Sequence, residues 1–416
     1  MSSRFVDYSE SGPNLLGTSA TAPARKIQAT FRFKNTDVTT ANTLRRVLLT
    51  HTQSVGFRTE PYEKSDVEIS INTTPLVNEM IAHRIGMIPI YADPNTFDVS
   101  LYEFHLDKEN STKEIIDVRA SDFRVYKKSI SNPLEDVVEI PASEFFPPDP
   151  ITGDTVLITR LRPQWNPTAN NERLKLKARA SISNGKENIR WSPVCQVSYE
   201  YTPNTDPIHI QSVFANWLLN NKKIDDQSKL SDEKRDELMR EFKTMEIQRC
   251  YLRNEKNEPN DFTFHMESVG IQSIPFIVSA GLKECETLVS NYKDCDTNLP
   301  ANVKFQVGDS RFPSIDVVFQ NEDHTLGNLL ETCIVNTHID GSESPKINYV
   351  GYKVPHPLRP EMFVRMDTRT KAEVNGNISV SVEQQIERSK RVLANVCRNI
   401  MREFQVLQVE WNTLTA

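Results

Sequence analysis

One segment of this chain occurs twice. Residues 319–335 (FQNEDHTLGNLLETCIV) align with residues 33–49 (FKNTDVTTANTLRRVLL), and one phenylalanine, two asparagines, one aspartate, one threonine and one leucine are identical in the two copies. In each copy a strand-like alternation precedes an aspartate that can cap a helix, and leucines at helical spacing follow it. The repeat therefore predicts two related units, each with a strand, a capped turn and an amphipathic helix.

Each unit also ends in a long helix with an apolar stripe, at residues 275–292 and 382–407. Such a stripe must be buried against another element, and two related units facing each other about a pseudo-twofold axis would bury all four stripes. We therefore expect an α+β fold in which two units form an intramolecular pseudo-dimer, with an interface made by Leu44, Leu48, Val278, Leu282, Leu326, Leu330, Leu393 and Ile400. The stripes alone would also fit two independent domains that never touch.

The first unit is interrupted by a long insertion. Residues 91–201 contain many prolines and several strand-like runs, which predicts an inserted, mostly β subdomain. The first unit then comprises residues 27–90 and 202–293, a linker spans 294–302, and the second unit spans 303–416. Residues 1–26 are rich in small and polar residues, and we expect them to form a disordered arm. The charged segment 220–250 predicts an exposed helix.

Composition excludes several classes of function. The net charge of −7 argues against a protein that grips phosphate backbones by itself, and no run of 18 apolar residues could span a membrane. The six cysteines include no C-x-x-C pair, so we expect neither a zinc module nor a disulfide framework. No glycine-rich phosphate loop and no D-x-D-x-D aspartate cluster occurs. We therefore expect no catalytic residues, no metal and no cofactor.

Several motifs resemble those of one family. The first half contains ANTLRRVLL, NTTPLVNEMIAHRIGMIP, GKENIRWSP and FTFHMESVG, and the second contains NEDHTLGNLL and VGYKVPHP, in this order. In these motifs and their order the chain resembles the α-like subunits of multisubunit DNA-dependent RNA polymerases. Its first half is similar to the third subunit of polymerase II or its archaeal D-type counterpart, and its second half is similar to the eleventh subunit or its archaeal L-type counterpart.

The resemblance implies a fused, non-catalytic platform that joins the two large catalytic subunits of the polymerase and also binds small assembly subunits. DNA would be contacted only indirectly through the complex, and no membrane is involved. Nuclear members of the family carry a zinc-binding cysteine cluster after the segment that ends here at Pro89, but residues 91–114 contain no cysteine. The fusion resembles the arrangement in large DNA viruses, which implies the host cytoplasm and the virion, or otherwise the nucleus.

Three polar or aromatic residues are candidates for binding a partner. Arg45 and Arg46 follow Leu44 on the polar edge of the first repeated helix, and the resemblance implies that this helix faces the second-largest subunit; the alternative is two solvated arginines. Trp191 precedes a Ser-Pro turn and could anchor the same partner or simply fill a local core. Two other classes of function compete: an enzyme with an unrecognised site, and a nucleic-acid-binding module, which the acidic balance disfavours.

Overall fold

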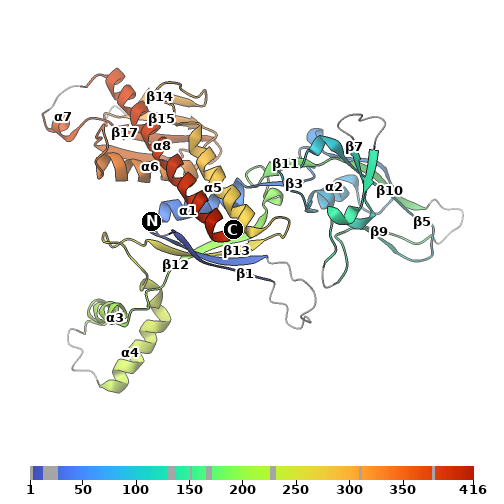
Figure 1. Cartoon of the computed structure of the whole chain (residues 1–416), viewed down its shortest axis with the longest axis horizontal. Coiled ribbons are helices and arrows are strands. Elements are labelled where there is room, and N and C mark those ends of the chain that lie inside the picture. The colour runs from blue at the N-terminus through green and yellow to red at the C-terminus, as the bar shows by residue number, and fades with distance from the viewer. Residues whose placement is uncertain are drawn as a thin grey trace.

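The computed structural model describes residues 3–12, 27–128, 137–149, 152–164, 171–224, 231–308, 312–376 and 380–416. These residues form three parts (Figure 1). A body contains two antiparallel sheets and the helices that cover them. An insert domain, rich in strands, extends from one side of the body, and a helical hairpin projects from another side.

The first half of the body is a four-stranded antiparallel sheet with strand order β1-β2-β13-β12, together with helices α1 and α5. Strand β2 alternates in burial, so that Ala29, Phe31 and Phe33 enter the core with the apolar faces of the two helices. The elements are β1 (Phe5–Ser11), β2 (Gln28–Lys34), α1 (Val38–Thr50), β12 (Val194–Tyr201), β13 (Asp261–Ser268) and α5 (Ile274–Ser290).

The second half repeats this plan with the strand order β14-β15-β17-β16. Helix α6 ends in a π-helical turn at Val335–Ile339, and helix α8 extends for 34 residues, or about 50 Å at 1.5 Å per residue. The elements are β14 (Val303–Val307), β15 (Ile315–Gln320), α6 (His324–Ile334), β16 (Tyr349–Lys353), β17 (Glu361–Asp367), α7 (Lys371–Asn375) and α8 (Val382–Thr415). The repeat predicted from the sequence is thus a repeat of structure.

The insert domain has its own hydrophobic core, in which Phe57, Phe104, Phe123 and Phe146 pack ring against ring. Its main sheet has the order β4-β10-β5-β7-β8, and a second sheet pairs β6 with β9. The elements are β4 (Val67–Asn72), α2 (Asn78–Gly86), β5 (Tyr102–Asn110), β6 (Ile116–Arg119), β7 (Arg124–Lys128), β8 (Val137–Ile140), β9 (Leu157–Leu161) and β10 (Glu172–Ala178). Short 3-10 turns occur at Tyr62–Lys64, Val99–Leu101, Ala120–Asp122 and Ala142–Glu144.

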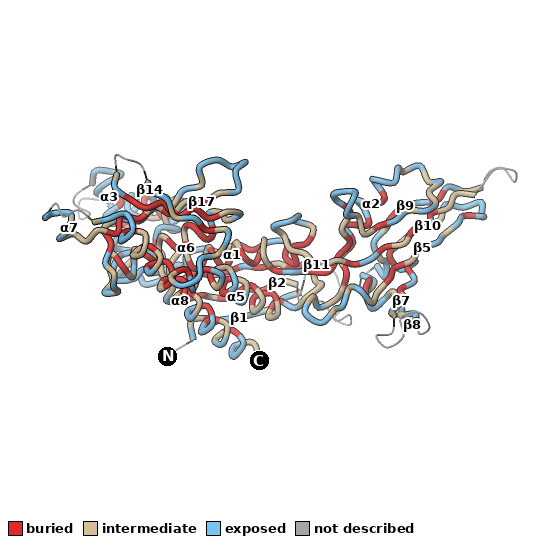
Figure 2. Tube along the Cα trace, turned by 90° about the horizontal axis from the view of Figure 1, so that it is seen from above, coloured by how far each residue is buried: buried red, intermediate tan, exposed pale blue. Residues whose placement is uncertain are grey.

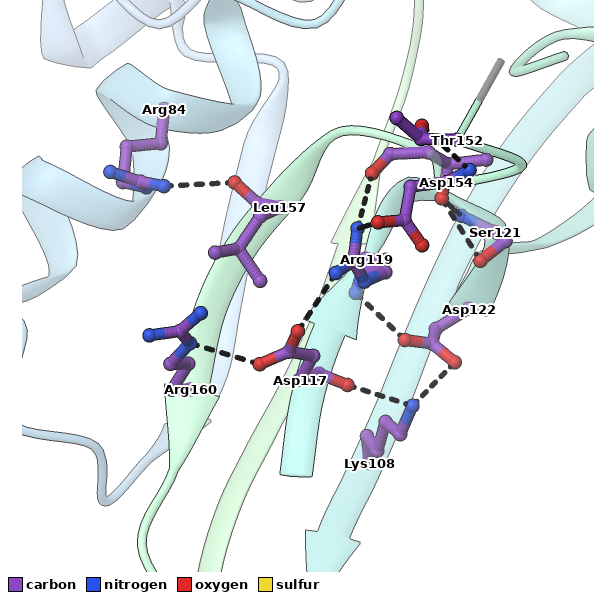
Figure 3. Close-up of polar contacts among 11 residues, drawn as sticks. Arg84, Lys108, Asp117, Arg119, Ser121, Asp122, Thr152, Asp154, Leu157 and Arg160 are labelled. Carbon is purple, nitrogen blue, oxygen red and sulfur yellow. Dashed lines mark hydrogen bonds and ion pairs between the residues drawn. The ribbon is translucent and has the colours of Figure 1, made fainter. Parts of the chain in front are cut away.

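Charged side chains of the insert domain largely satisfy one another around the β6–β9 sheet (Figure 3). The Asp117 carboxylate accepts hydrogen bonds from Arg119 at 2.9 Å and from Arg160 at 3.0 Å, and Lys108 bonds Asp122 at 2.6 Å. Ion pairs between partly exposed side chains contribute little stability each, and here they link β6 to β9 and β5 to the 3-10 turn Ala120–Asp122. This cluster is therefore a structural network.

Two smaller pieces complete the chain. Strand β3 (Gln53–Gly56) pairs with β11 (Ser181–Asn184) and, with the 3-10 turn Ile189–Trp191, forms the neck between body and insert domain. The helical hairpin consists of α3 (Pro207–Lys222) and α4 (Asp232–Met245), followed by a 3-10 turn at Ile247–Arg249. Phe214, Trp217 and Phe242 form its separate core. The expected exposed helix in 220–250 is α4, while residues 225–230 lie outside the described residues.

The boundaries between the first unit and the insert domain differ from those expected from the sequence. Strand β4 and helix α2 were expected in the first unit, but β4 pairs with β10 and α2 packs in the core of the insert domain. Strand β12 was expected in the insert, but it pairs with β13 in the body. Within the expected disordered arm 1–26, residues 5–11 form strand β1; residues 1–2 and 13–26 lie outside the described residues.

Candidate functional site: the helical interface between the two halves

The identical residues of the repeat build the same turn in both halves. Asn35 and Asn321 adopt left-handed backbone conformations, with φ of 51° and 64°, which asparagine tolerates better than most residues. The carboxylates of Asp37 and Asp323 then each accept a backbone N–H at 2.7 Å at the start of the following helix. The repeat therefore sets the direction in which α1 and α6 leave their sheets.

The two halves meet on a surface formed by α1 and α5 from the first half and α6 and α8 from the second, called the helical interface below. One hydrophobic core runs through all four helices and both sheets, and Figure 2 shows the buried residues along these elements. The structure places the eight residues that the sequence assigned to a pseudo-dimer interface in this core, each no more than 2% exposed: Leu44, Leu48, Val278, Leu282, Leu326, Leu330, Leu393 and Ile400.

Polar contacts across the helical interface follow a pseudo-twofold relation. The hydroxyls of Thr39 on α1 and Thr332 on α6 lie 3.0 Å apart. The Nε of Arg46 on α1 donates to the hydroxyl of Thr325 on α6 at 2.9 Å. The repeat aligns Thr39 with Thr325 and Arg46 with Thr332, so each contact is the image of the other. This pairing is that of an isologous interface, here formed within one chain.

Helices α5 and α8 form the longer side of the helical interface. The indole Nε1 of Trp411 donates to the backbone oxygen of Pro275 at 3.0 Å, and the side-chain amide of Gln405 donates to Glu286 at 2.8 Å. The Trp411 ring is fully buried. Helix α8 of the second half therefore contacts the first half through both apolar packing and hydrogen bonds.

Strand β1 adds a second connection between the halves. Phe5 lies 5.3 Å from the Trp411 ring, and Arg4 reaches Glu410 and Glu403 on α8 at 3.4 and 3.1 Å. Burial raises the pKa of the Glu403 carboxyl, which Arg4 partly offsets. This strand was not predicted from the sequence, because it is short, mostly polar and lies in a stretch rich in small and polar residues. Asp7 has a φ of 54°, and the register with β2 shifts between Val6 and Ser9.

The two candidate arginines differ in their surroundings. Besides its bond to Thr325, Arg46 places Nη2 3.8 Å from the Asp323 carboxylate of the second half. Arg45 instead donates to Asn42 of its own helix at 3.0 Å. The sequence placed both residues on an edge free for a third protein, but the structure engages Arg46 in the helical interface, because one turn of α6 lies against that side of α1.

Trp191 occupies the neck. Its side chain is 2% exposed, its backbone oxygen accepts a hydrogen bond from Ser54 at 2.6 Å, and Arg58 lies over its ring at 5.7 Å. A Cβ atom added at Gly56 would come within 3.0 Å of the ring, so strand β3 passes directly over it. Of the two alternatives for Trp191, this placement favours the local core, because the ring fills the joint between body and insert domain.

An exposed apolar surface lies on helix α2 and the residues flanking it. Val77, Met80 and Met87 are between 55 and 57% exposed. Three large apolar side chains on one short segment are more than the scattered exposure that is normal for a protein surface. All three lie in the motif NTTPLVNEMIAHRIGMIP. Ile81 and Ile85, four residues apart, form the buried stripe of α2. Val77, Met80 and Met87 are the apolar residues that this stripe leaves exposed, and the sequence contained this signal.

The thiols of this chain are poorly suited to act as nucleophiles. All six cysteines are free, and burial raises the pKa of Cys295 to about 12 and raises the pKa values of Cys285, Cys333 and Cys397 as well, so these thiols stay protonated. In the described ranges no group of three or more histidine, cysteine, aspartate or glutamate residues is arranged to hold a metal ion. Nor does any helix of that part of the chain combine the length and apolar character needed to cross a membrane.

These features define a class of protein: two α+β units that dimerise through paired helices. The family model of the RNA polymerase Rpb3/Rpb11 dimerisation domain matches residues 30–286, and a second model with the same description matches residues 314–410. The first match alone spans more than half of the chain, so the chain belongs to the Rpb3/Rpb11 dimerisation-domain family of RNA polymerase. Both units of the body thus carry a dimerisation domain of this family, and this homology supports an assembly role in a DNA-directed RNA polymerase.

Individual relatives agree with the family match. The chain is 27% identical over 213 residues to DNA-directed RNA polymerases II, IV and V subunit 3 of Arabidopsis thaliana, covering 47% of this chain and 60% of the relative. It is 30% identical over 187 residues to DNA-directed RNA polymerases I and III subunit rpac1 of Dictyostelium discoideum, covering 42% and 49%. To subunit RPAC1 of polymerases I and III of Saccharomyces cerevisiae it is 23% identical over 308 residues, covering 64% and 84%. The chain thus spans about half to three fifths of the first two relatives.

Proposed function

We propose that this chain is the non-catalytic assembly platform of a multisubunit DNA-directed RNA polymerase, on which the two large catalytic subunits are joined. The observation that carries the proposal is the helical interface. One chain supplies both dimerisation units, and their apolar stripes are buried against each other. The outer surfaces of the body and insert domain are therefore what the chain offers to other subunits.

At equivalent positions of the repeat, the two units have similar residues in the core but different residues outside it. Leu44 and Leu330 are equivalent in the repeat and equally buried, but the next position is Arg45 in the first copy and Glu331 in the second. A pseudo-symmetric platform that holds two different large subunits needs such a difference, since apolar positions serve pairing and polar positions choose partners. Arg45 is our candidate for contact with the second-largest subunit, with Arg46 beside it holding α1 in place.

The proposal includes the other partners implied by the family. Small assembly subunits bind the same platform, and DNA is reached only through the complex, in keeping with the net charge of −7. No cofactor is needed for this role. Because both dimerisation units lie in one chain, we also propose a gene fusion of the type found in large DNA viruses, with the protein in the host cytoplasm and the virion.

The test is purification of the native complex through a tag on this chain. We expect two large polymerase subunits in stoichiometric amounts, and reduced recovery of the second-largest one with Arg45→Glu at an unchanged melting temperature. Arg240→Glu, at an exposed position of α4, makes the same charge change and is the matched control. A purified chain without large polymerase subunits would refute the platform, and protein inventories of virions against nuclei would decide the location.

A further inference from the structure

A hollow of about 600 Å³ lies between helix α2, strand β4 and the 3-10 turn Tyr62–Lys64 of the insert domain. Its walls are strongly acidic, because they include four glutamates: Glu60, Glu63, Glu68 and Glu79. One of them has a cationic partner, since Arg190 lies 3.2 Å from the Glu60 carboxylate. Within the described part of the chain the other three carboxylates form no ion pair, and all three residues are exposed.

The hollow continues around helix α2 onto the exposed apolar surface. A second hollow of about 380 Å³, lined by Leu76, Met80 and Arg84, shares Glu79 and His83 with the first. The walls of this second hollow are mostly apolar. Helix α2 thus lies between an apolar strip and the acidic hollow, to which the helix contributes Glu79 and the neighbouring 3-10 turn and strand β4 contribute Glu63 and Glu68.

The arginine of α2, Arg84, does not neutralise the carboxylates of the acidic hollow. Arg84 donates to the backbone oxygen of Leu157 on strand β9 at 2.8 Å (Figure 3). It also donates to the backbone oxygen of Ile158 at 2.5 Å. These bonds engage the guanidinium, and among the described residues Arg84 forms no ion pair with Glu63, Glu68 or Glu79. The negative charge of the hollow therefore remains available to a partner.

We infer that helix α2 and the acidic hollow form a docking site for a segment of another polymerase subunit that carries lysine or arginine beside apolar side chains. The inference rests on the proposed function, since it takes the partner from the same complex. The apolar side of such a segment would cover Met80 and Leu76, and its cations would enter the hollow. Arginine suits this site best, because its planar guanidinium can bond a carboxylate through two N–H groups at once.

The first test uses the native complex purified through this chain. Zero-length coupling with a carbodiimide joins a carboxylate to a lysine amine as an amide, with loss of water. We expect amides from Glu63, Glu68 or Glu79 to lysines of one other subunit. If these glutamates couple to no other subunit while the large subunits are present, and the salt test below also finds no loss of retention, the docking site is refuted and the platform stands. If no large subunits are present, the proposed function itself fails.

The second test covers a partner whose cations are arginines. Glu68→Gln with Glu79→Gln should release the subunit found next to the hollow at lower salt, with its retention reduced on the order of tenfold at moderate salt. Glu233→Gln with Glu237→Gln makes the same charge change on exposed positions of α4 and serves as the control. If the two double variants retain the subunit equally well, and their melting temperatures are equal, the inference is overturned. This holds whether both retain it as the unchanged chain does or both retain it more weakly.

Discussion

Truncation of Leu330 tests the packing of the helical interface. The side chain of Leu330 is fully buried in the core that joins the two halves. Leu330→Ala removes its apolar contacts and leaves a cavity, which costs about 2 to 5 kcal/mol of unfolding free energy in well-packed cores. Other members of this core, such as Leu44, Phe319 and Leu393, are themselves fully buried. They have little freedom to fill the cavity, so we expect the upper half of the range.

The assay is urea denaturation of the full chain, followed by the fluorescence of Trp411 in a background where the other three tryptophans are phenylalanine. Trp411 contacts Phe5 and Phe31 of the first half, so its signal reports on the body and not on the insert domain. Leu44→Ala, the equivalent change in the first half, should produce a similar loss at the same reporter. Leu358→Ala, at a position 86% exposed, is the control. A loss below about 0.5 kcal/mol for Leu330→Ala would place α6 on the surface and refute the shared core.

Three further perturbations test other parts of the structure. Trp411→Ala should cost about 3 to 5 kcal/mol in denaturation followed by circular dichroism, because a fully buried ring is lost; a cost below about 1 kcal/mol would show that α8 is not fastened there. Arg46→Glu should lower the melting temperature more than Arg45→Glu, since Arg46 alone of the two bonds the second half; equal values would contradict that geometry. Burial by itself would raise the pKa of Glu103, but hydrogen bonds from Lys128 and Lys177 outweigh it and hold the pKa at about 2. The stabilisation from Glu103 is therefore complete above its unfolded pKa of about 4.3 and is lost as the pH falls toward 2, so Glu103→Gln should flatten the acid unfolding of the insert domain in that window; an unchanged pH dependence would refute this role.

The parts of the fold that depend on local sequence were predictable. Asn35 with Asp37, and Asn321 with Asp323, specify a left-handed turn and a helix cap within a few residues, so two copies of the pattern predict two copies of the structure. The buried leucines follow from helical spacing for the same reason.

The parts that depend on distant pairing were not predictable in the same way. Strand β4 belongs to the insert domain because it pairs with β10, about 100 positions later, and no local feature of residues 67–72 records that choice. Arg46 looks like any exposed helical arginine until α6 lies beside it. Tryptophan is a residue type that often anchors interfaces, and only the passage of β3 over the Trp191 ring makes this residue part of the neck between body and insert domain. Long-range packing decided each of these cases.

The copy number of this chain in the purified polymerase tests the account most directly. Native mass spectrometry of the intact complex measures it together with the identity of every other subunit. Because both dimerisation units are paired within one chain, we predict one copy of this chain per complex, beside one copy of each large subunit and no separate subunit of the Rpb11 type. Two copies of the chain, or one copy with a separate Rpb11-like partner, would show that the helical interface opens to pair between molecules, and would contradict the account.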